Sequence, residues 1–406
     1  MTETLITSIP EFQMSLLLFV ALAGYLIAYR INQLAVVGII LAGIAVGPSW
    51  LGLVTYTDFV SSLARLGAVV LLFTIGLEFK IKDISKPWYF LIALMGILLP
   101  WSGGFILAEA FHFDFSASIF IGTALTATSI AITANVLREM GKLQTQAAKA
   151  IIGAAVIDDV LALMALSVSQ GLVSGALSFS SISIVMLKAV AFLVIGALIG
   201  RLVVARLMER FSKIKLTEQY PESVFLFAMM IAFLYGLVAE LVGLSAIVGS
   251  FLAGISLAGV KVKHGRIFKE GANHLQIIFA SIFFVSLGVI LDLHVVTINP
   301  LWFILALSIL AVLTKLIGCG IPAKLSGMTL KDSLVVGVGM APRGEVAMII
   351  ALLGLNQKLI SQETYVALIL MSLLTTIFPP LILKNWLFRR GQDFAAGEST
   401  PPTPEG

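Results

Sequence analysis

Two adjacent aspartates stand at the centre of the apolar segment "GAAVIDDVLALMALSVSQG", residues 153–171. A carboxylate in the middle of a lipid bilayer costs about 2.5–3.5 kcal/mol even on the lenient insertion scale, so acids at this depth indicate a function. Because neighbouring helical residues point in different directions, Asp158 and Asp159 cannot share one partner. We expect one carboxylate to face a lysine and the other to face a watery path, where it can exchange a proton for a cation.

The basic partner is expected in another apolar segment. Lys315 lies near the middle of "ILAVLTKLIGC", and a buried lysine needs a counter-charge to stay protonated. A static ion network that holds helices together is the alternative interpretation of these charges. Intramembrane ionisable residues are functional by default, which favours the first interpretation.

The segment "GVGMAPRGE" is predicted to lie in a helix that contains charged residues and is interrupted by proline and glycine. Proline removes a backbone donor and glycine loosens the turn, so this helix should be interrupted near Pro342 and should expose free carbonyl groups. Arg343 and Glu345 flank the expected break. We interpret them as a structural ion network that satisfies the freed backbone groups.

Hydroxyl side chains crowd a further apolar segment, "GTALTATSIAITAN", which includes Thr126, Thr128 and Ser129. The segment contains no proline, and Ser and Thr can bond back to their own helix, so a break is less strongly indicated here. These residues fit two roles equally well, as packing residues between helices or as oxygen ligands along a cation path.

The composition requires a membrane protein. Of the residues 59% are hydrophobic and 12% are charged, whereas a soluble domain carries about 25% charged residues. The net charge of +4 comes from basic residues spread over many loops, which argues against a nucleic-acid surface. The single cysteine, Cys319, and four scattered histidines offer neither a disulfide framework nor metal-ligand spacing, so no cofactor is expected.

Apolar runs between polar breaks predict an all-α protein with thirteen transmembrane helices, near 14–31, 33–47, 58–78, 88–111, 115–136, 149–170, 178–207, 222–240, 244–259, 274–292, 299–323, 332–356 and 363–385. Of the 26 basic residues, 21 fall in loops on one side of the membrane, one falls on the other side and four lie within spans. Cytoplasmic loops collect Lys and Arg, so the N-terminus is expected outside and the C-terminus inside.

Two six-helix halves on either side of the span at 178–207 must have inverted orientations. Inverted repeats with ion sites on interrupted helices at corresponding positions are an architecture of secondary transporters. The two suspected breaks fall on the fifth helix of each half, so the sequence predicts a carrier with interrupted helices at corresponding positions.

The segments "AAVIDDVLAL", "GTALTATSIAITANVLREMG" and "GVGMAPRGE" occur in this order on these helices. They resemble the cation:proton antiporter-2 family, and most closely its NapA-type bacterial Na⁺/H⁺ antiporters. The resemblance extends over nearly the whole membrane region, and it implies a homodimer with an elevator-like movement. The implied parts are an interface domain at 12–79 and 222–293, a transport core at 88–171 and 299–386 with two broken helices that cross, and a linker helix at 178–207. The composition of residues 391–406 predicts a disordered tail.

The resemblance also implies roles for individual residues. Asp159 matches the principal carboxylate that binds Na⁺ and exchanges the proton. Asp158 matches the neighbour that pairs with Lys315, and it is expected to help Asp159 bind Na⁺. Thr126, Thr128 and Ser129, with Pro342, match the helix crossing near that site. Ser281 stands where relatives often carry proline, which leaves the bend of its helix open.

The predicted function is exchange of Na⁺ or Li⁺ for H⁺ by alternating access, in support of pH homeostasis. The resemblance favours an electrogenic cycle. A K⁺/H⁺ antiporter is the main alternative, because oxygen ligands do not reveal the radius of their cation. An ion channel and an intramembrane aspartyl protease are rival classes, and the latter would need a second aspartate on another helix. The expected location is the bacterial plasma membrane, and another energised internal membrane is the alternative. Membrane lipid is an expected partner in either case.

Overall fold

The computed structural model describes residues 9–175, 179–260, 265–292, 294 and 301–388. In these residues every regular element is a helix, and no strand occurs. Nine of the described helices are long and apolar enough to cross a membrane. The predicted tail at 391–406 lies outside the described residues.

The long helices carry the apolar sequence runs. They are α2 (Pro10–Arg30), α4 (Asp58–Gly76), α6 (Trp88–Ala110), α9 (Gln146–Ser174), α10 (Phe179–Ile199), α13 (Ser223–Leu241), α15 (Gly265–Val289), α16 (Leu301–Leu325) and α19 (Gln362–Ile382). Shorter helices with apolar stretches are α3 (Ala35–Val46), α7 (Phe115–Ala124), α8 (Ile130–Glu139), α14 (Ala246–Leu257), α17 (Leu330–Gly339) and α18 (Glu345–Asn356). The remaining elements are α5 (Ile81–Ile84), η1 (Gly200–Val204), α11 (Ala205–Phe211), α12 (Lys215–Gln219) and η3 (Leu383–Leu387).

Hydroxyl side chains begin several of these helices. The side chain of Thr57 accepts a hydrogen bond from the backbone N–H of Val60 at the start of α4, and Thr145 does the same for Ala148 in α9. Such caps satisfy backbone donors that have no partner within the helix. They fix where α4 and α9 begin, and thereby the depth at which their later residues lie.

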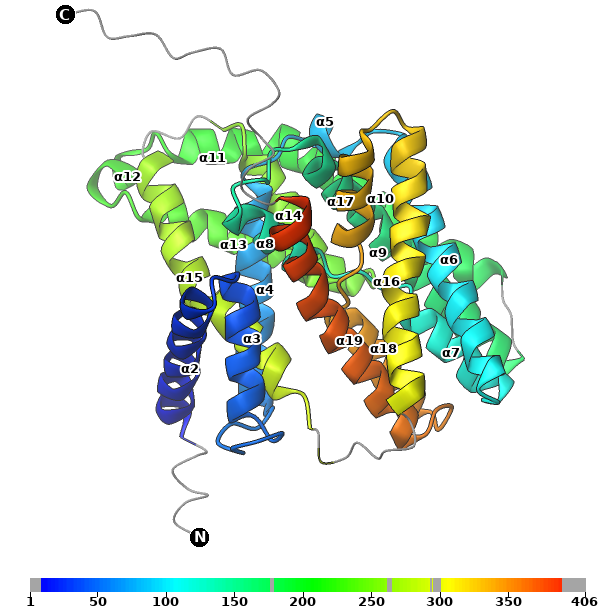
Figure 1. Cartoon of the computed structure of the whole chain (residues 1–406). Coiled ribbons are helices and arrows are strands. Elements are labelled where there is room, and N and C mark those ends of the chain that lie inside the picture. The colour runs from blue at the N-terminus through cyan, green and yellow to red at the C-terminus, as the bar shows by residue number, and fades with distance from the viewer. Residues whose placement is uncertain (1–8, 176–178, 261–264, 293, 295–300, 389–406) are drawn as a thin grey trace, which may run out of the picture.

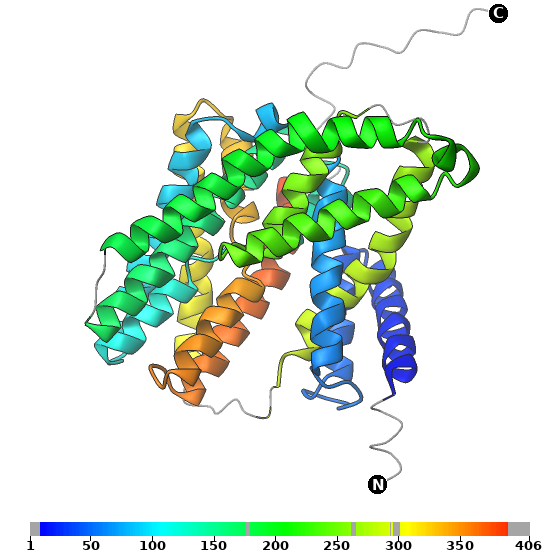
Figure 2. The same cartoon turned by 180° about the vertical axis from the view of Figure 1, so that it is seen from behind.

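Helix packing divides the described chain into two groups, visible on the left and right of Figure 1. The first group consists of α2, α3, α4, α13, α14 and α15. The second group consists of α6, α7, α9, α16, α17, α18 and α19, and the short α5 packs on α9 in this group. Figure 2 shows α10, η1 and α11 crossing the back of the molecule obliquely as one continuous rod.

Glycines allow the helices of the first group to approach closely. A Cβ atom added at Gly254 of α14 would lie 2.2 Å from the carbonyl oxygen of Phe73 in α4. A Cβ atom at Gly288 of α15 would lie 2.3 Å from the carbonyl oxygen of Ile40 in α3. In lipid, small residues at such contacts let helix backbones pack tightly. These glycines therefore set the spacing of α3, α4, α14 and α15.

Two helices are interrupted. Residues 125–129 separate α7 from α8, and residues 340–344, which include Pro342, separate α17 from α18. The break at Pro342 confirms the expectation from the proline and glycines. The break between α7 and α8 was the weaker expectation, and it forms without a proline.

Some helix boundaries differ from the sequence expectation. The span expected at 178–207 continues to Phe211, because η1 adds a π-helical turn without ending the helix. The short helices α5 and α12 were not predicted, since their five or fewer residues carry no readable periodicity. Helix α15 runs through Ser281 without a break, and the Ser281 hydroxyl donates a hydrogen bond to the carbonyl of Ile277 (2.7 Å).

Candidate functional site: two aspartates beside crossed helix breaks

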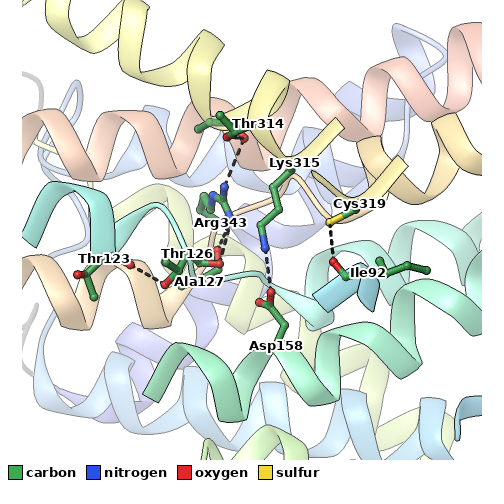
Figure 3. Close-up of polar contacts among 10 residues, drawn as sticks. Ile92, Thr123, Thr126, Ala127, Asp158, Thr314, Lys315, Cys319 and Arg343 are labelled. Carbon is green, nitrogen blue, oxygen red and sulfur yellow. Dashed lines mark hydrogen bonds and ion pairs between the residues drawn. The ribbon is translucent and has the colours of Figure 1, made fainter. Parts of the chain in front are cut away.

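Asp158 and Lys315 form an ion pair between α9 and α16. The Lys315 Nζ atom donates a hydrogen bond to Asp158 Oδ1 at 3.0 Å, as Figure 3 shows. The two side chains are 1% and 0% exposed. Removing two charges from water is expensive, and only close pairing with further hydrogen bonds compensates for it. Asp158 is therefore committed to Lys315 in this structure.

The ion pair has room because α6 presents a glycine to it. A Cβ atom at Gly96 would lie 2.6 Å from the sulfur of Cys319, 3.5 Å from Lys315 Nζ and 3.8 Å from Asp158 Oδ1. Cys319 is itself buried, and its Sγ atom donates to the carbonyl of Ile92 at 3.6 Å. Helix α6 thus closes the side of the pair that faces away from the helix breaks.

Arg343 joins the two interruptions. It lies in the break between α17 and α18, and it is completely buried. Its Nη1 atom donates to the carbonyl oxygens of Ala127 (2.5 Å) and Thr126 (3.4 Å), in the break between α7 and α8, and its Nη2 atom donates to Ala311 of α16 (3.3 Å). A guanidinium group thereby satisfies carbonyls that the broken helix leaves without partners.

Backbone atoms tie the same two breaks together. The N–H group of Ser129 donates to the carbonyl of Pro342 at 2.9 Å, and the Thr133 hydroxyl donates to the carbonyl of Gly339 at 2.6 Å. The interruptions therefore meet directly beside α9. This arrangement agrees with the sequence interpretation that Arg343 satisfies freed backbone groups, while the side chain of Glu345 lies outside the described residues.

Asp159 faces a cavity instead of a lysine. It is partly exposed and lines a space of 240 Å³ together with Arg65 of α4 and Glu240 at the end of α13. A smaller space of 20 Å³ reaches from Asp159 to Thr128, Ser129 and Gly344 at the helix breaks. The two adjacent aspartates thus point into different surroundings, as expected for neighbouring residues on a helix.

The three predicted hydroxyl residues do not lie alike. Thr128 and Ser129 line the small space beside Asp159. The Thr126 hydroxyl instead donates back to the carbonyl of Thr123 at 2.7 Å. Thr128 and Ser129 therefore lie beside Asp159, whereas the Thr126 hydroxyl is bonded within its own segment.

At one end of the molecule the two helix groups are held together by polar contacts. We call it the basic end, because Lys80 and Lys82 closely follow Glu78, the partner of Arg138, and Arg206 lines one cavity with both lysines. Arg138 of α8 lies 3.5 Å from Glu78 and donates hydrogen bonds to Asn273 and Gln276 of α15. Glu139 accepts a hydrogen bond from the N–H group of Ala35 at the start of α3 (2.6 Å).

Partial burial at this junction raises the pKa of Glu139 above its ordinary value, although the Ala35 and Val36 N–H groups and nearby Lys384 oppose the change. Lys384 of η3 donates a further hydrogen bond to the carbonyl of Asn32 (2.6 Å). The groups are thus joined at the basic end, whereas the cavity at Asp159 lies between them on the side of Arg65, toward the start of α4.

Comparison with known proteins identifies the family. The family model described as "Sodium/hydrogen exchanger, transmembrane" matches residues 16–389. The chain belongs to the sodium/hydrogen exchanger family. A Na⁺/H⁺-K⁺ antiporter of Bacillus cereus, GerN, is 35% identical over 92% of this chain and 95% of its own length. A Na⁺/H⁺ antiporter of Enterococcus hirae is 34% identical over 91% of this chain and 96% of its own length.

A solved sodium proton antiporter, MjNhaP1 from Methanocaldococcus jannaschii, shares the fold of this exchanger family member. Its TM-score is 0.66 at 17% identity, with 93% of this chain and 97% of that chain covered. The chain is thus a multi-pass integral membrane protein of a family of antiporters, not of proteases or other enzymes. Its bacterial relatives are consistent with a bacterial plasma membrane.

Sequence reasoning on this exchanger missed two features of the site. Gly96 was not singled out, although one glycine inside an apolar helix is a signal of a close contact. The contacts of Arg138 and Glu139 were also missed, because charges at the end of a helix carry no information about their partners. Both features depend on which helices become neighbours.

Proposed function

We propose that the chain exchanges Na⁺ for H⁺, with Asp159 as the site that both ions share. The observation that carries this proposal is the division between the aspartates: Asp158 is held by Lys315, and Asp159 opens to a cavity. A carboxylate in a cavity can lose its proton and bind a cation in its place. Competition for one site couples the two ions without a second binding site.

Thr128 and Ser129 are proposed to supply oxygen atoms to the bound cation. They line the small space beside Asp159, and the interrupted backbone nearby offers carbonyl groups, as in other carriers with broken helices. Arg343 occupies carbonyls of the break and carries a positive charge close by. We propose that it holds the crossing in place and takes no part in ion binding.

The movement proposed is a displacement of the second helix group against the first. In this proposal the two groups are the transport core and the interface domain, the chain crosses the membrane thirteen times in two inverted repeats, and two copies form a dimer. Basic loops favour the cytoplasm, so the basic end is placed inside. The cavity at Asp159 then opens outward while the contacts of Arg138 and Glu139 close the inner side.

Sodium is the proposed cation, with lithium as a substitute. The names of similar antiporters mention Na⁺, and the name of GerN also mentions K⁺. Potassium therefore stays as the second candidate. The cycle is proposed to be electrogenic, because a cation at Asp159 can draw Asp158 from its pair and release a proton from Lys315.

The test is exchange in proteoliposomes that contain a pH-sensitive dye. The lumen is made acidic relative to the medium, and Na⁺, Li⁺ or K⁺ is then added to the medium in separate runs. We expect Na⁺ and Li⁺ to dissipate the gradient with the native protein and to have no effect with Asp159→Asn. The matched control is Asp58→Asn, which removes an exposed acid at the start of α4.

Each outcome has a distinct meaning. Substantial Na⁺-dependent proton movement in folded Asp159→Asn would contradict the shared site. A K⁺ response as strong as the Na⁺ response would replace sodium with potassium as the cargo. Loss of exchange in Asp58→Asn as well would show that the assay reports damage to the protein instead of the chemistry of Asp159.

A further inference from the structure

A second cavity, separate from the cavity at Asp159, lies at the basic end where three elements meet. Its volume is 760 Å³. One wall is α5 with its flanking residues, the second is η1 with α11, and the third is the final turn of α14 with the residues that follow it, up to Val260. We call it the basic cavity. No step of the proposed ion exchange uses it.

The basic cavity has an excess of positive charge. Lys80, Lys82, Arg201 and Arg206 line it, with Glu209 as the acid among the lining residues. The Glu209 carboxylate already accepts a bond from Lys213 at 2.8 Å. Among the described residues, no ion pair or side-chain hydrogen bond holds any of the four basic side chains.

The acid next to these lysines on α5 does not neutralise them. Asp83 lies 3.5 Å from Lys149 of α9, and it also accepts a bond from the backbone N–H of Lys80. Its carboxylate is thus used to fasten α5 to α9. Four exposed cations around one hollow repel one another unless an anion lies between them. The charge pattern therefore indicates a place for an anionic ligand.

An irregular turn presents Arg201 at this cavity. Residues Gly200–Val204 form a π-helical turn inside the otherwise α-helical rod of α10 and α11. Gly200 packs so closely on α14 that an added Cβ atom would lie 1.9 Å from the Ser256 hydroxyl oxygen. Single π-helical turns shift the side chains around them and are frequent at functional sites. This backbone feature is independent of the charge count and falls on the same cavity.

The surroundings of the cavity suit an amphiphile. Ile255, Ala258 and Val260 contribute apolar surface to its lining. Along the rod, Ile199, Leu202 and Val203 are 45%, 45% and 54% exposed, so an apolar surface continues from the cavity. A ligand with an anionic head and a hydrocarbon tail would contact both kinds of surface. A soluble anion would use only the basic residues.

We propose that the basic cavity binds the phosphate-bearing headgroup of an anionic phospholipid. Arg201 and Arg206 can each offer two parallel N–H donors to phosphate oxygens. Lys80 and Lys82 add charge from the opposite wall. Basic hollows between helices at the cytoplasmic side of a membrane are suited to such headgroups.

A headgroup in the basic cavity would connect the two helix groups, which have to move apart during ion exchange. This consequence rests on the proposed function. Helix α5 packs on α9 in the second group, whereas α14 belongs to the first group. A headgroup bound between Lys82 of α5 and Arg206 of α11, which packs on α13 and α14 of the first group, contacts both sides. It stabilises the arrangement in which the basic end is closed, and it therefore slows the ion exchange cycle.

Binding is tested first without transport. Purified protein in neutral detergent is unfolded by heat with added phosphatidylglycerol, phosphatidylcholine or inorganic phosphate. We expect phosphatidylglycerol to raise the unfolding temperature, with an apparent affinity about tenfold weaker in Arg201→Gln/Arg206→Gln. The matched control, Arg210→Gln/Lys215→Gln, removes two exposed charges nearby that do not line the cavity.

A second variant protects the test against misfolding. If Arg201→Gln/Arg206→Gln fails to fold, Lys80→Gln/Lys82→Gln changes the other wall and should weaken the lipid effect in the same way. Equal loss in the control variant would overturn the proposal in favour of general surface charge. An equal effect of inorganic phosphate would overturn the lipid assignment, because a soluble anion would then suffice.

Transport gives the second readout. In vesicles with phosphatidylglycerol we expect slower exchange than in neutral vesicles for the native protein and for the control variant, and no difference for the cavity variant. Lipid binding without any change in exchange would overturn the regulatory step alone. Absence of exchange in every vesicle would contradict the proposed function, and the unfolding experiment would still decide whether the lipid binds.

Discussion

At the scale of the residue, the two aspartates differ through their surroundings and not through their chemistry. Asp158 is buried against Lys315, and Asp159 is in contact with a cavity. The sequence predicted this division from helix geometry alone, and it predicted Lys315 as a partner from its depth. It could not predict the carbonyl partners of Arg343, because these depend on how two broken helices cross.

The ion pair should behave as one unit in stability measurements. Asp158→Asn or Lys315→Gln leaves a single buried charge, so each variant is expected to lose about 3–5 kcal/mol of stability. Asp158→Asn/Lys315→Gln removes both charges and retains a hydrogen bond, so it should recover most of this loss. Thermal unfolding in detergent measures all three variants.

The comparison of single and double variants decides the interpretation. If the double variant is as unstable as the sum of the single variants, the two residues contribute independently and do not form the unit described here. Loss of exchange in a stable double variant would show that the pair contributes to the cycle beyond its part in folding.

At the scale of the element, the interrupted helices are the feature that the sequence predicted unevenly. Pro342 indicated one break because proline removes a backbone donor and obstructs the preceding turn. The break at residues 125–129 has no such marker in its sequence. Its freed carbonyls are bonded by Arg343, and the N–H of Ser129 is bonded by Pro342. The break at residues 125–129 is therefore stabilised by contacts with the break at Pro342. The sequence around residues 125–129 carries no sign of these contacts.

Thr133 tests how strongly the two broken helices depend on each other. Its hydroxyl donates to the carbonyl of Gly339 between α8 and α17, with both groups buried. Thr133→Val keeps the shape and leaves this carbonyl without its donor, so a loss of about 1–3 kcal/mol is expected. Thr133→Ser keeps the donor and should stay close to the native protein.

Thermal unfolding and Na⁺-driven exchange are measured together for both variants. The valine variant should lose stability and exchange rate, while the serine variant should retain most of both. A valine variant as stable and as active as the serine variant would contradict a contribution of this hydrogen bond to the crossing.

At the scale of the whole molecule, two packed helix groups meet along an interface that is polar at one end and hollow at Asp159. The contacts of Arg138, Glu139 and Lys384 join the groups at the basic end. Periodicity and charge predicted the positions of the nine long described helices apart from their ends, and they did not predict α5 and α12. The contacts between the groups could not be predicted, since they arise only from the arrangement of elements distant in the chain.

A cross-link at the basic end should stop exchange if the groups have to separate there. Ala35→Cys/Glu139→Cys places one thiol on α3 of the first group and one on α8, which packs on α9 of the second group and also contacts α3 and α4. A hydrogen bond joins the two positions in the native protein. A short cleavable reagent should reduce Na⁺/H⁺ exchange to the level of empty vesicles, and reductive cleavage should restore it. The native Cys319 is buried and provides no competing thiol.

The control cross-link joins two elements of the same group. Asp83 and Lys149 form an ion pair between α5 and α9, so Asp83→Cys/Lys149→Cys should be cross-linked with most of its exchange intact. Full exchange in the cross-linked Ala35/Glu139 variant would exclude a cycle in which α8 leaves α3. If only the cross-linked Ala35/Glu139 variant stops exchange, the two helix groups have to separate at the basic end to admit ions from that side. The cross-linked Asp83/Lys149 variant excludes a general effect of the reagent, because its cross-link lies within one group and leaves that group free to move.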